Sequence, residues 1–311
     1  MTTTAPKTLI EAIQYFSDNS RCVEFLSNLR WANGVECVHC GSKHVKGLAA
    51  GPNFKCYDCK KKFSVKQGTI FEKSPLSLTK WLTALWLITN AKNGISSYEI
   101  HRSVGVTQKT AWFMLHRIRE AMREDSFVKF TGTVETDETF VGGKPSNRHF
   151  SERQESKQGQ KSHRTIVHGM LERGGDVRAS VVDDQKAKTL LPRLRENVAP
   201  GATIYTDTLR SYLGLSKDYN HGIVDHENNE YVIERENEKI HTNTIEGYWG
   251  LLKRCYKGTY IHIAPFHLDR YLDEQAARYN MRKGTDGSRF VAIARQTNGR
   301  RLTWNELTGK L

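Results

Sequence analysis

Thr133-Val-Glu-Thr-Asp137-Glu-Thr-Phe-Val-Gly-Gly-Lys144 is the stretch from which the fold of this chain can be worked out. Small or apolar residues alternate with polar ones in it, which is typical of a β-strand, and the two glycines then end the strand. Asp137 falls in the middle, where burying a carboxylate costs free energy unless a partner compensates its charge. A metal ion is one such partner.

Two later acids stand where they could share that partner. Asp207 ends a short apolar run, and Glu246 lies within residues 241–254, which we expect to form a helix. Two strands and a helix that each supply one acid would make a divalent-metal site built from hard oxygen ligands. Asp183 and Asp184 also end an apolar run and compete with Asp207, but only Asp207 is followed directly by a helix start.

The expected helix carries two further polar candidates. Lys253 follows Glu246 by seven residues, about two turns, so both lie on one face, where the lysine could hold a phosphate. Asn243 precedes Glu246 by one turn and could point at the same site. A carboxylate neutralises a divalent cation, whereas an amide offers only a carbonyl oxygen. We therefore assign Glu246 to the metal and Asn243 to a supporting position.

The charge of the chain indicates a polyanionic partner. The 311 residues, enough for two or three small domains, carry a formal net charge of +13 and have a pI near 9.4. Residues 1–130 hold 19 Lys and Arg against 10 Asp and Glu, whereas the remainder holds 28 against 24. This division favours a DNA-binding N-terminal part and a metal-binding C-terminal part, with a merely solvated basic surface as the alternative.

Neither a secretory signal nor a membrane span is predicted. Residues 1–16 lack an apolar core of the required length, and the longest apolar run, residues 81–88, is far shorter than the ~18 residues of a spanning helix. Four of the six cysteines form two tight pairs, which fits metal binding in a reducing compartment better than a disulfide framework. We therefore expect a soluble, intracellular protein that has no membrane partner.

The two cysteine pairs predict a zinc ribbon. They are Cys37-Val-His-Cys40 and Cys56-Tyr-Asp-Cys59, and the fifteen residues between them match the two-knuckle spacing of tetrahedral zinc. Four thiolates close the coordination shell, so the single zinc ion would be structural; four unrelated buried cysteines are the alternative. A basic edge suited to phosphates follows the last cysteine and consists of Lys60, Lys61 and Lys62.

Residues 76–125 are expected to be helical and to contain a helix-turn-helix. A helix over residues 96–104, a turn that includes Gly105, and a second helix over about 108–123 follow that plan. The start of the second helix would face bases in the major groove, which assigns base reading to Gln108, Lys109 and Thr110. Backbone contacts or plain solvated charges are expected of Arg117, Arg119 and Arg123. An ordinary helical bundle is the alternative.

The other segments predict a mixed α/β layer. Residues 145–162 are expected to form a long polar loop. Two alternating runs, 163–172 and 176–182, would pair with the Asp137 strand, and a helix over 187–198 would return the chain to the sheet. A further helix is expected over 265–282.

At this point the chain resembles the zinc-ribbon insertion-sequence transposases of the DDE class, an ISXO-like family. The resemblance covers residues 16–282 and rests on the order of the cysteine pairs, the helix-turn-helix and several matching stretches. These stretches are Lys109-Thr-Ala-Trp-Phe-Met-Leu-His-Arg-Ile-Arg119, Val134-Glu-Thr-Asp137-Glu-Thr-Phe-Val-Gly-Gly143, Tyr205-Thr-Asp207, His241-Thr-Asn-Thr-Ile-Glu246-Gly-Tyr-Trp249 and Lys257-Gly-Thr-Tyr-Ile-His-Ile263.

The resemblance implies a fold and a chemistry. It implies an α/β, RNase H-like mixed-sheet domain in which Asp137, Asp207 and Glu246 bind two Mg²⁺ ions, for which Mn²⁺ could substitute, with Asn243 as the alternative in the third position. Water would attack a phosphodiester at the element's end, and the freed 3′-hydroxyl would then attack target DNA. No covalent protein intermediate is needed.

The expected domain order follows from these assignments. It is a helical lead-in (1–35), a zinc ribbon (36–72), a helix-turn-helix domain (73–128), the catalytic domain (129–283) and a basic C-terminal tail (284–311). Expected partners are double-stranded DNA, at the terminal inverted repeats and the target, and further copies of the chain in a homodimer or larger oligomer. The expected location is the bacterial cytoplasm, at the nucleoid. An RNase H-like nuclease that stops at cleavage, and a catalytically inactive DNA-binding regulator, stay open as alternatives.

Overall fold

The chain divides into two compact units. The computed structural model describes residues 6–48, 53–125, 128–142, 164–225, 228, 232–235 and 238–310. The first unit combines residues 1–123 with 281–311, and the second is the continuous segment 124–280. The polar loop predicted over 145–162 lies outside the described residues. Within those residues, no helix is both long enough and apolar enough to cross a membrane.

The zinc ribbon of the first unit is a small antiparallel sheet. Its strands are β1 (Val45–Gly47), β2 (Asn53–Cys56) and β3 (Lys62–Ser64), in that order across the sheet. The pairing aligns Val45 with Cys56 and Phe54 with Phe63. This register lets the cysteine pairs approach from two turns that lie at one end of the sheet.

Helices make up the rest of the first unit. They are α1 (Leu9–Phe16), α2 (Asn19–Arg30), α3 (Leu78–Asn90), α4 (Ser97–Val104), α5 (Gln108–Met122), α10 (Asp286–Gln296) and α11 (Trp304–Thr308). The predicted helix-turn-helix segment shows clear end signals. Ser96 and Glu99 form a capping box at the start of α4, Gly105 ends α4 with a φ of 63°, and Thr107 caps α5.

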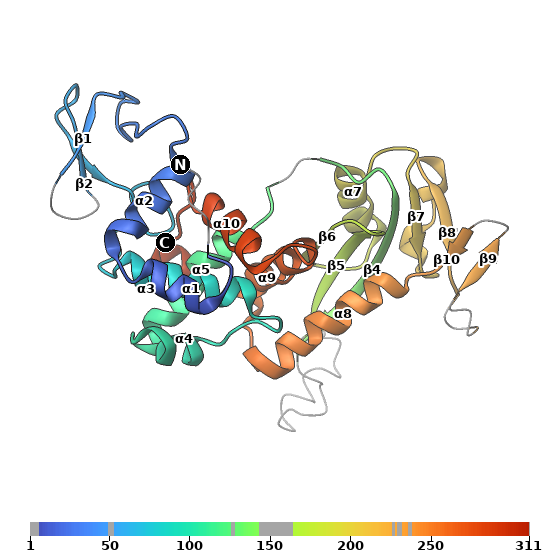
Figure 1. Ribbon diagram of the computed structural model, residues 1–311. Helices are drawn as coiled ribbons and strands as arrows, with labels where there is room; N and C mark the ends of the chain where they lie inside the picture. The colour runs from blue at the N-terminus through green and yellow to red at the C-terminus, as the bar shows by residue number, and fades with distance from the viewer. Residues whose placement is uncertain are drawn as a thin grey trace. The chain divides into compact units, whose positions relative to one another are not determined.

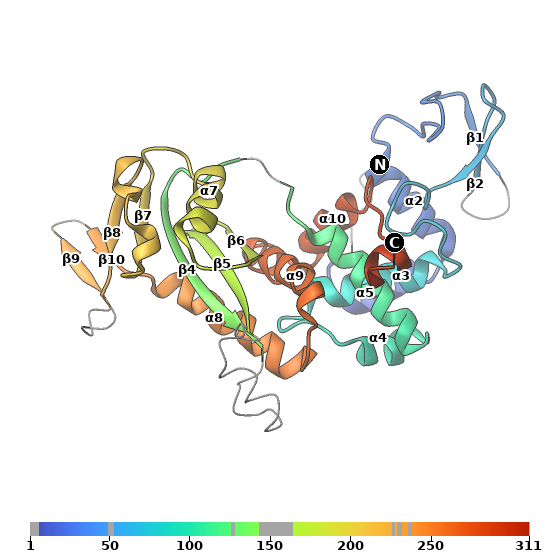
Figure 2. The same ribbon diagram turned by 180° about the vertical axis from the view of Figure 1, so that it is seen from behind.

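The segment expected to be a basic C-terminal tail is instead helical and packed into the first unit. Residues 286–296 and 304–308 form α10 and α11 and belong to the first unit, so the C-terminus lies beside α5 when seen from either side (Figures 1 and 2). Phe290 is fully buried, with ring centroids 5.4 Å from Phe16, 5.6 Å from Phe25 and 5.1 Å from Trp86. Burial of this ring holds the segment in the core despite its basic composition.

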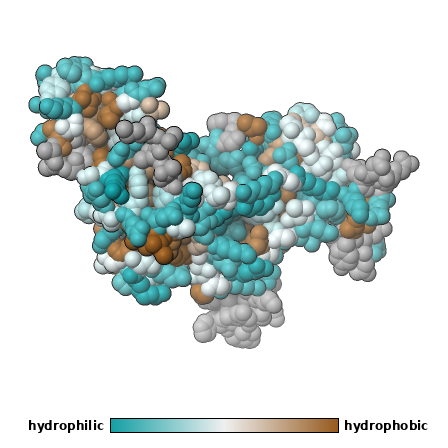
Figure 3. Space-filling view, viewed as in Figure 1, coloured by the Kyte–Doolittle hydropathy of each residue, from teal (hydrophilic) through white to brown (hydrophobic). Residues whose placement is uncertain are grey.

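The apolar residues of α1 and α2 are only partly buried. Phe16, Phe25 and Leu26 are in the core, whereas Ile10 and Ile13 are 69% and 50% exposed. Together with the neighbouring leucine of α1 they form the apolar surface that covers α1 in Figure 3. The other elements of the first unit therefore cover only part of the apolar surface of α1 and α2.

A five-stranded mixed sheet forms the second unit, in the order β6-β5-β4-β7-β8. The bounds are β4 (Thr133–Val141), β5 (Thr165–Glu172), β6 (Val177–Val182), β7 (Thr203–Thr206) and β8 (Asn220–Ile223). β4, β5 and β6 pair antiparallel, as the alternating runs predicted, whereas β7 runs parallel to β4 and β8 parallel to β7. A separate hairpin joins β9 (Ile233–Arg235) to β10 (Glu238–Ile240).

Helices cover both faces of this sheet (Figure 1). On one face α7 (Ala187–Asn197) buries its leucines against Val134 and Met170. On the other, α8 (Asn243–Cys255) and α9 (Leu268–Asn280) pack on Val141 and Val167. A π-helical segment (Tyr256–Tyr260) extends α8, and a short 3₁₀ helix (Pro265–His267) leads into α9. This mixed α/β architecture, which follows an N-terminal zinc ribbon in the sequence, confirms the predicted fold class and is consistent with an RNase H-like catalytic domain.

Candidate active site and zinc centre

The alternation of β4 sends its acids to opposite faces of the sheet. Glu135 and Asp137 point toward α8, since both hydrogen-bond groups of that helix. Glu138 points to the other face, where Tyr212 donates a hydrogen bond to it. One strand with period-two geometry therefore supplies polar groups to two separate environments.

Asp137 is positioned by its neighbours on β5 and α8. Trp249 Nε1 donates a 3.0 Å hydrogen bond to Asp137 Oδ2, and Gly169 stands opposite Asp137 on β5. A Cβ atom at position 169 would lie 2.5 Å from the Trp249 ring, closer than any normal contact. The indole can therefore reach the carboxylate only because position 169 is glycine.

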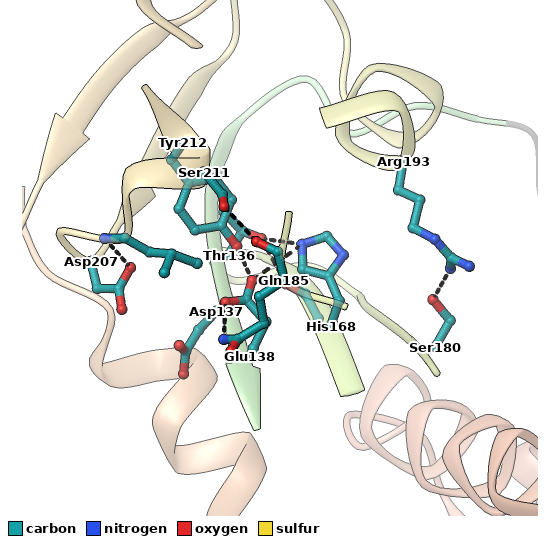
Figure 4. Close-up of polar contacts among 12 residues, drawn as sticks. Thr136, Asp137, Glu138, His168, Ser180, Gln185, Arg193, Asp207, Ser211 and Tyr212 are labelled. Carbon is teal, nitrogen blue, oxygen red and sulfur yellow. Dashed lines mark hydrogen bonds and ion pairs between the residues drawn. The ribbon is translucent and has the colours of Figure 1, made fainter. Parts of the chain in front are cut away.

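Asp207 stands beside Asp137 because β7 is the parallel neighbour of β4. The register pairs Glu135 with Tyr205, and the same offset of 70 residues places Asp207 level with Asp137. Asp207 Oδ1 accepts a hydrogen bond from the Leu209 amide, 3.0 Å, which fixes the side chain at the strand end (Figure 4).

The competing acids lie elsewhere in the sheet. Asp183 is exposed after β6, two strands away from β4, and Asp184 accepts hydrogen bonds from Lys186 N and Thr189 Oγ1 at the start of α7. The structure thus brings Asp207 to Asp137 and leaves Asp183 and Asp184 outside the site.

Glu246 belongs to the first turn of α8, on its exposed side. Thr242 Oγ1 donates a hydrogen bond of 3.3 Å to Glu246 Oε1. Asn243 and Lys253, the two other candidates on this helix, are exposed as well. Asn243 and Glu246 are three residues apart and Lys253 follows seven later, so all three fall on one side of α8.

A buried carboxylate on β4 anchors the N-terminus of α8. Glu135 is fully buried and accepts hydrogen bonds from Thr244 N (2.8 Å), Thr244 Oγ1 (2.8 Å) and Ile245 N (3.0 Å). Arg173 Nε donates to Glu135 Oε1 at 2.7 Å. The Thr242 side chain does not cap α8, so Glu135 of β4 caps the helix instead. Its negative charge also interacts favourably with the positive N-terminal end of the helix dipole.

The three acids influence each other electrostatically. The pKa of Asp137 is raised to about 6, mainly by burial. Hydrogen bonds from the Glu138 amide and Trp249 oppose this rise, and the negative charges of Asp207 and Glu246 add to it. Three carboxylates that repel one another fit divalent cations, which would compensate the charge and accept hard oxygen ligands.

The spread of the acids differs from that of the cysteines. In the part of the chain that the structure describes, only the four cysteines bring three or more ligand atoms within 4.8 Å of one another. The oxygen atoms of Asp137, Asp207 and Glu246 are therefore further apart than the four sulfur atoms.

Glu138 is a buried acid that the sequence reasoning missed. Tyr212 donates to its Oε1, and Gln185 Nε2 donates to Oε2 at 3.1 Å (Figure 4). Burial raises the pKa of Glu138 to about 7 in spite of these two hydrogen bonds, with the charges of Asp137 and Asp207 adding to the effect. The available signal was strand alternation, which turns the residue after Asp137 toward the opposite face.

A buried histidine completes this second network. His168 Nε2 and Thr136 Oγ1 are 2.9 Å apart, and Nε2 lies 4.0 Å from Glu138 Oε1. Burial, reinforced by the positive charge of Arg193, lowers the pKa of His168 to about 4, so the ring is neutral near pH 7. Glu135, Trp249 and Gly169 were missed as well, because each acts through a partner far away in the sequence.

The four cysteines fit a tetrahedral zinc ion. Cys37 Sγ and Cys59 Sγ are 3.6 Å apart, and Cys40 Sγ and Cys56 Sγ are 3.7 Å apart. Zinc–sulfur bonds of ~2.3 Å arranged as a tetrahedron require sulfur atoms about 3.8 Å apart. Together with the zinc-ribbon fold, this cluster indicates structural zinc.

The predicted DNA-contacting residues fall into two groups. The lysines of the basic edge, Lys60, Lys61 and Lys62, are all exposed. At the start of α5, Gln108 Nε2 donates to Ser97 Oγ at 2.8 Å, Thr110 Oγ1 lies 2.8 Å from Thr107 Oγ1, and Lys109 is exposed with its Nζ 4.8 Å from the Trp304 ring centroid.

The prediction of surface charges along α5 is wrong for Arg117 and Arg119. Their exposed fractions are 4% and 1%. Arg117 donates a 2.7 Å hydrogen bond to the Glu72 carbonyl oxygen and lies over the rings of Trp81 and Phe113. Helices on several sides of α5 cover these positions, which a single helical periodicity cannot reveal. Arg123, after the helix, is exposed as expected.

Comparisons with known proteins agree with this architecture. The family model for the ISXO2-like transposase domain matches residues 129–280, and that for the transposase zinc-ribbon domain matches residues 17–62. A Halobacterium salinarum protein described as an "Uncharacterized protein in transposable element ISH50" is 28% identical over 259 residues, which cover 78% of this chain and 84% of that protein. A Haemophilus influenzae "Uncharacterized transposase-like protein" is 33% identical over 106 residues, 32% of this chain and 77% of the relative.

Proposed function

Because this chain belongs to the ISXO2-like transposases that carry a transposase zinc ribbon, we propose that it binds the ends of an insertion sequence, cleaves them with divalent metal ions and joins the freed 3′-hydroxyls to target DNA. The carboxylates of Asp137, Asp207 and Glu246 are the proposed metal ligands. Mg²⁺ is the proposed cofactor, with Mn²⁺ as a substitute.

One observation carries this proposal. The parallel register of β4 and β7 brings Asp207 level with Asp137, and α8, which carries Glu246, is tied to the same strand through Glu135. Burial is the main cause of the raised pKa of Asp137, and the charges of Asp207 and Glu246 add to it. Nothing in a sheet of this kind requires an acid on the central strand to stand near two further acids, so a charge-compensating ligand is the simplest reason for them.

The chemistry of the site follows from the chain's own groups. Bound metal ions would activate the attacking oxygen and stabilise the leaving oxygen of a phosphodiester. Trp249 holds the Asp137 carboxylate in one orientation, and the exposed Lys253 would contact the DNA backbone along α8. Asn243 would orient a ligand or a phosphate from the preceding turn.

DNA binding is assigned to the first unit. Its exposed lysines Lys60, Lys61 and Lys62 would contact phosphates, and the start of α5 would face the bases of the terminal repeat. Since an element has two ends, we propose that at least two copies of the chain act together.

A strand-transfer assay tests this function. A labelled DNA end with a free 3′-hydroxyl, a plasmid target and Mg²⁺ are expected to yield joined product with the wild-type protein. Asp137→Asn should abolish cleavage and joining because it removes a metal ligand, whereas Asp183→Asn, an exposed acid outside the site, should leave both unchanged. Cleavage without joining would identify a nuclease, and DNA binding without either reaction would identify a regulator.

The third ligand is tested on the same substrates. Glu246→Gln should abolish Mg²⁺-dependent cleavage while DNA binding, measured separately, persists. Asn243→Ala should leave a reduced but measurable rate, because an amide in the supporting position orients a ligand without neutralising the metal charge. The opposite ranking of the two variants would place Asn243 in the third position.

A further inference from the structure

A pocket of about 340 Å³ opens beside the N-terminal half of α5 in the first unit. Its walls come from four places in the chain: the segment 73–76 before α3, Trp81 of α3, one side of α5, and Trp304 of α11. Small-molecule sites have volumes from ~300 Å³ upward, so the pocket can hold one compact ligand. Neither the zinc ribbon nor the candidate active site uses it.

Aromatic rings form two walls of this pocket. Phe113 and Trp304 meet edge to face, with ring centroids 5.5 Å apart and planes at 87°. Trp81 lies deeper and is almost fully buried. Trp304 and Phe113 are both partly exposed, so each offers ring surface to a ligand that enters. A flat, aromatic ligand would replace water on these surfaces favourably.

Cationic groups complete the pocket. Lys109 Nζ lies 4.8 Å from the Trp304 ring centroid at the rim, and Lys73 is exposed on the other side. Arg117 also lines the wall, although only 4% of its surface is exposed. Its Nε has no hydrogen-bond partner within the described residues. Burial, reinforced by the positive charge of Arg301 and opposed by Glu72, lowers the pKa of Arg117 to about 10.

We propose that this pocket binds one unpaired nucleotide of the bound DNA, with its base against Trp304 and Phe113 and its phosphate near Lys109. The proposal rests on the proposed DNA binding of the first unit and adds a ligand class to it. Rings that stack on bases, next to cations that attract phosphate, are the combination by which proteins hold single-stranded nucleic acid.

The position of the pocket favours a nucleotide over other aromatic anions. The helix-turn-helix arrangement places the start of α5 at the DNA, and Lys109, Thr110 and Phe113, which line the pocket, lie on the first turns of that helix. An extrahelical base next to that contact has only a short distance to travel. The role also accounts for α11, a five-residue helix whose capping box holds Trp304 at its first position.

The test compares two short duplexes of identical sequence, one fully paired and one with a single extrahelical 2-aminopurine. We expect the full-length, zinc-loaded wild-type protein to bind the bulged duplex more tightly and to change the 2-aminopurine fluorescence. Trp304→Ala should weaken binding of the bulged duplex roughly five- to 150-fold, the range expected for the loss of one stacked base, and affect the paired duplex little. Trp304→Phe should keep most of the preference.

Controls separate this proposal from loss of folding and from failure of DNA binding. Phe266→Ala, which removes an exposed aromatic side chain from the other unit, should behave as wild type. Zinc content and thermal unfolding verify that each variant is folded. Equal binding of both duplexes by the wild type would overturn the pocket proposal while DNA binding stands, and absence of binding to either would overturn both. A change in oligomeric state on Trp304→Ala, with the preference intact, would show that the pocket holds a second copy of the chain.

Discussion

A single step along β4 separates two acids with different surroundings. Asp137 faces α8 and the two other candidate ligands, whereas Glu138 faces Tyr212 and Gln185. Both are largely removed from water, and burial is the main cause of the raised pKa of each. A metal ion can compensate the charge at Asp137. Glu138 has hydrogen-bond donors instead, which lower its pKa less than burial raises it.

The raised pKa of Glu138 makes the metal-free protein less stable at high pH. Its pKa is about 7 in the folded protein against 4.5 ordinarily, so the folded state holds the proton more tightly. Stability should therefore fall as the pH rises from about 4.5 to 7 and level off above. Glu138→Gln keeps a neutral group and should gain up to about 3 kcal/mol over wild type at pH 8 but little at pH 4.

Urea unfolding at these two pH values, with a chelator present, measures this effect. Glu234→Gln alters a carboxylate whose side chain is 71% exposed, and it should show no pH-dependent difference from wild type. A Glu138→Gln protein that is equally destabilised at both pH values would mean that Glu138 is ionised in the folded state and that its hydrogen bonds need the charge.

At the scale of elements, α8 is placed by a partner outside itself. The helix has no side-chain cap of its own, and Glu135 of β4 satisfies its first amides. The opposite side of α8 contributes Ile245 and Trp249 to the core beneath the sheet face. Anchor and core contacts together determine where Glu246 lies relative to Asp137.

Removing the anchor should affect both stability and catalysis. Glu135→Ala removes the buried charge partner of Arg173 and the acceptor of Arg173 Nε and of the Thr244 and Ile245 amides, which should cost about 3–5 kcal/mol in unfolding free energy. The cleavage rate per folded molecule should also fall, because Glu246 is displaced. The matched control is Glu172→Ala, which loses two amide hydrogen bonds at the start of β4, costs about 1 kcal/mol and should leave the rate unchanged.

The stability of the zinc ribbon is expected to depend on its metal ion. Three short strands bury few apolar side chains, so the ion should supply much of their stability. Cys56→Ser should reduce the zinc content from one per chain toward zero and unfold the ribbon. Cys22→Ser alters an equally buried cysteine outside the cluster and should retain the zinc. Atomic absorption on purified variants decides this, and full zinc in Cys56→Ser would contradict it.

At the scale of the whole molecule, the second unit is continuous in sequence and the first is not. The first unit is completed by α10, whose Phe290 contacts aromatic rings of α1, α2 and α3. The C-terminal segment is therefore part of the predicted DNA-binding unit, and its loss should harm that unit first.

Phe290→Ala tests this division. Truncating a fully buried Phe should destabilise the first unit by about 3–5 kcal/mol. DNA binding should fall at temperatures where the second unit remains folded. Limited proteolysis followed by mass spectrometry would locate the earliest cleavages, which we expect within residues 6–123 and 281–310. Early cleavage within 164–225 instead would contradict the division, and Phe266→Ala, an exposed position, should be protease-resistant.

Local sequence determined the elements that depend on short-range physics. The cysteine pairs, the capped helices α4 and α5 and the strand that carries Asp137 follow from spacing, end signals and alternation, all of which act over a few residues. Asp207 and Glu246 were also candidates from the sequence, because Asp207 ends an apolar run and Glu246 lies in an expected helix.

Only the tertiary structure decided which distant groups meet. The register of β4 with β7 brings Asp207 to Asp137 and excludes Asp183, and Gly169 makes room for Trp249 to reach Asp137. The burial of Arg117 and the placement of Trp304 beside α5 likewise depend on helices far apart in the chain. Packing and register are long-range properties, so an amphipathic pattern shows that a face is covered but not which residue covers it.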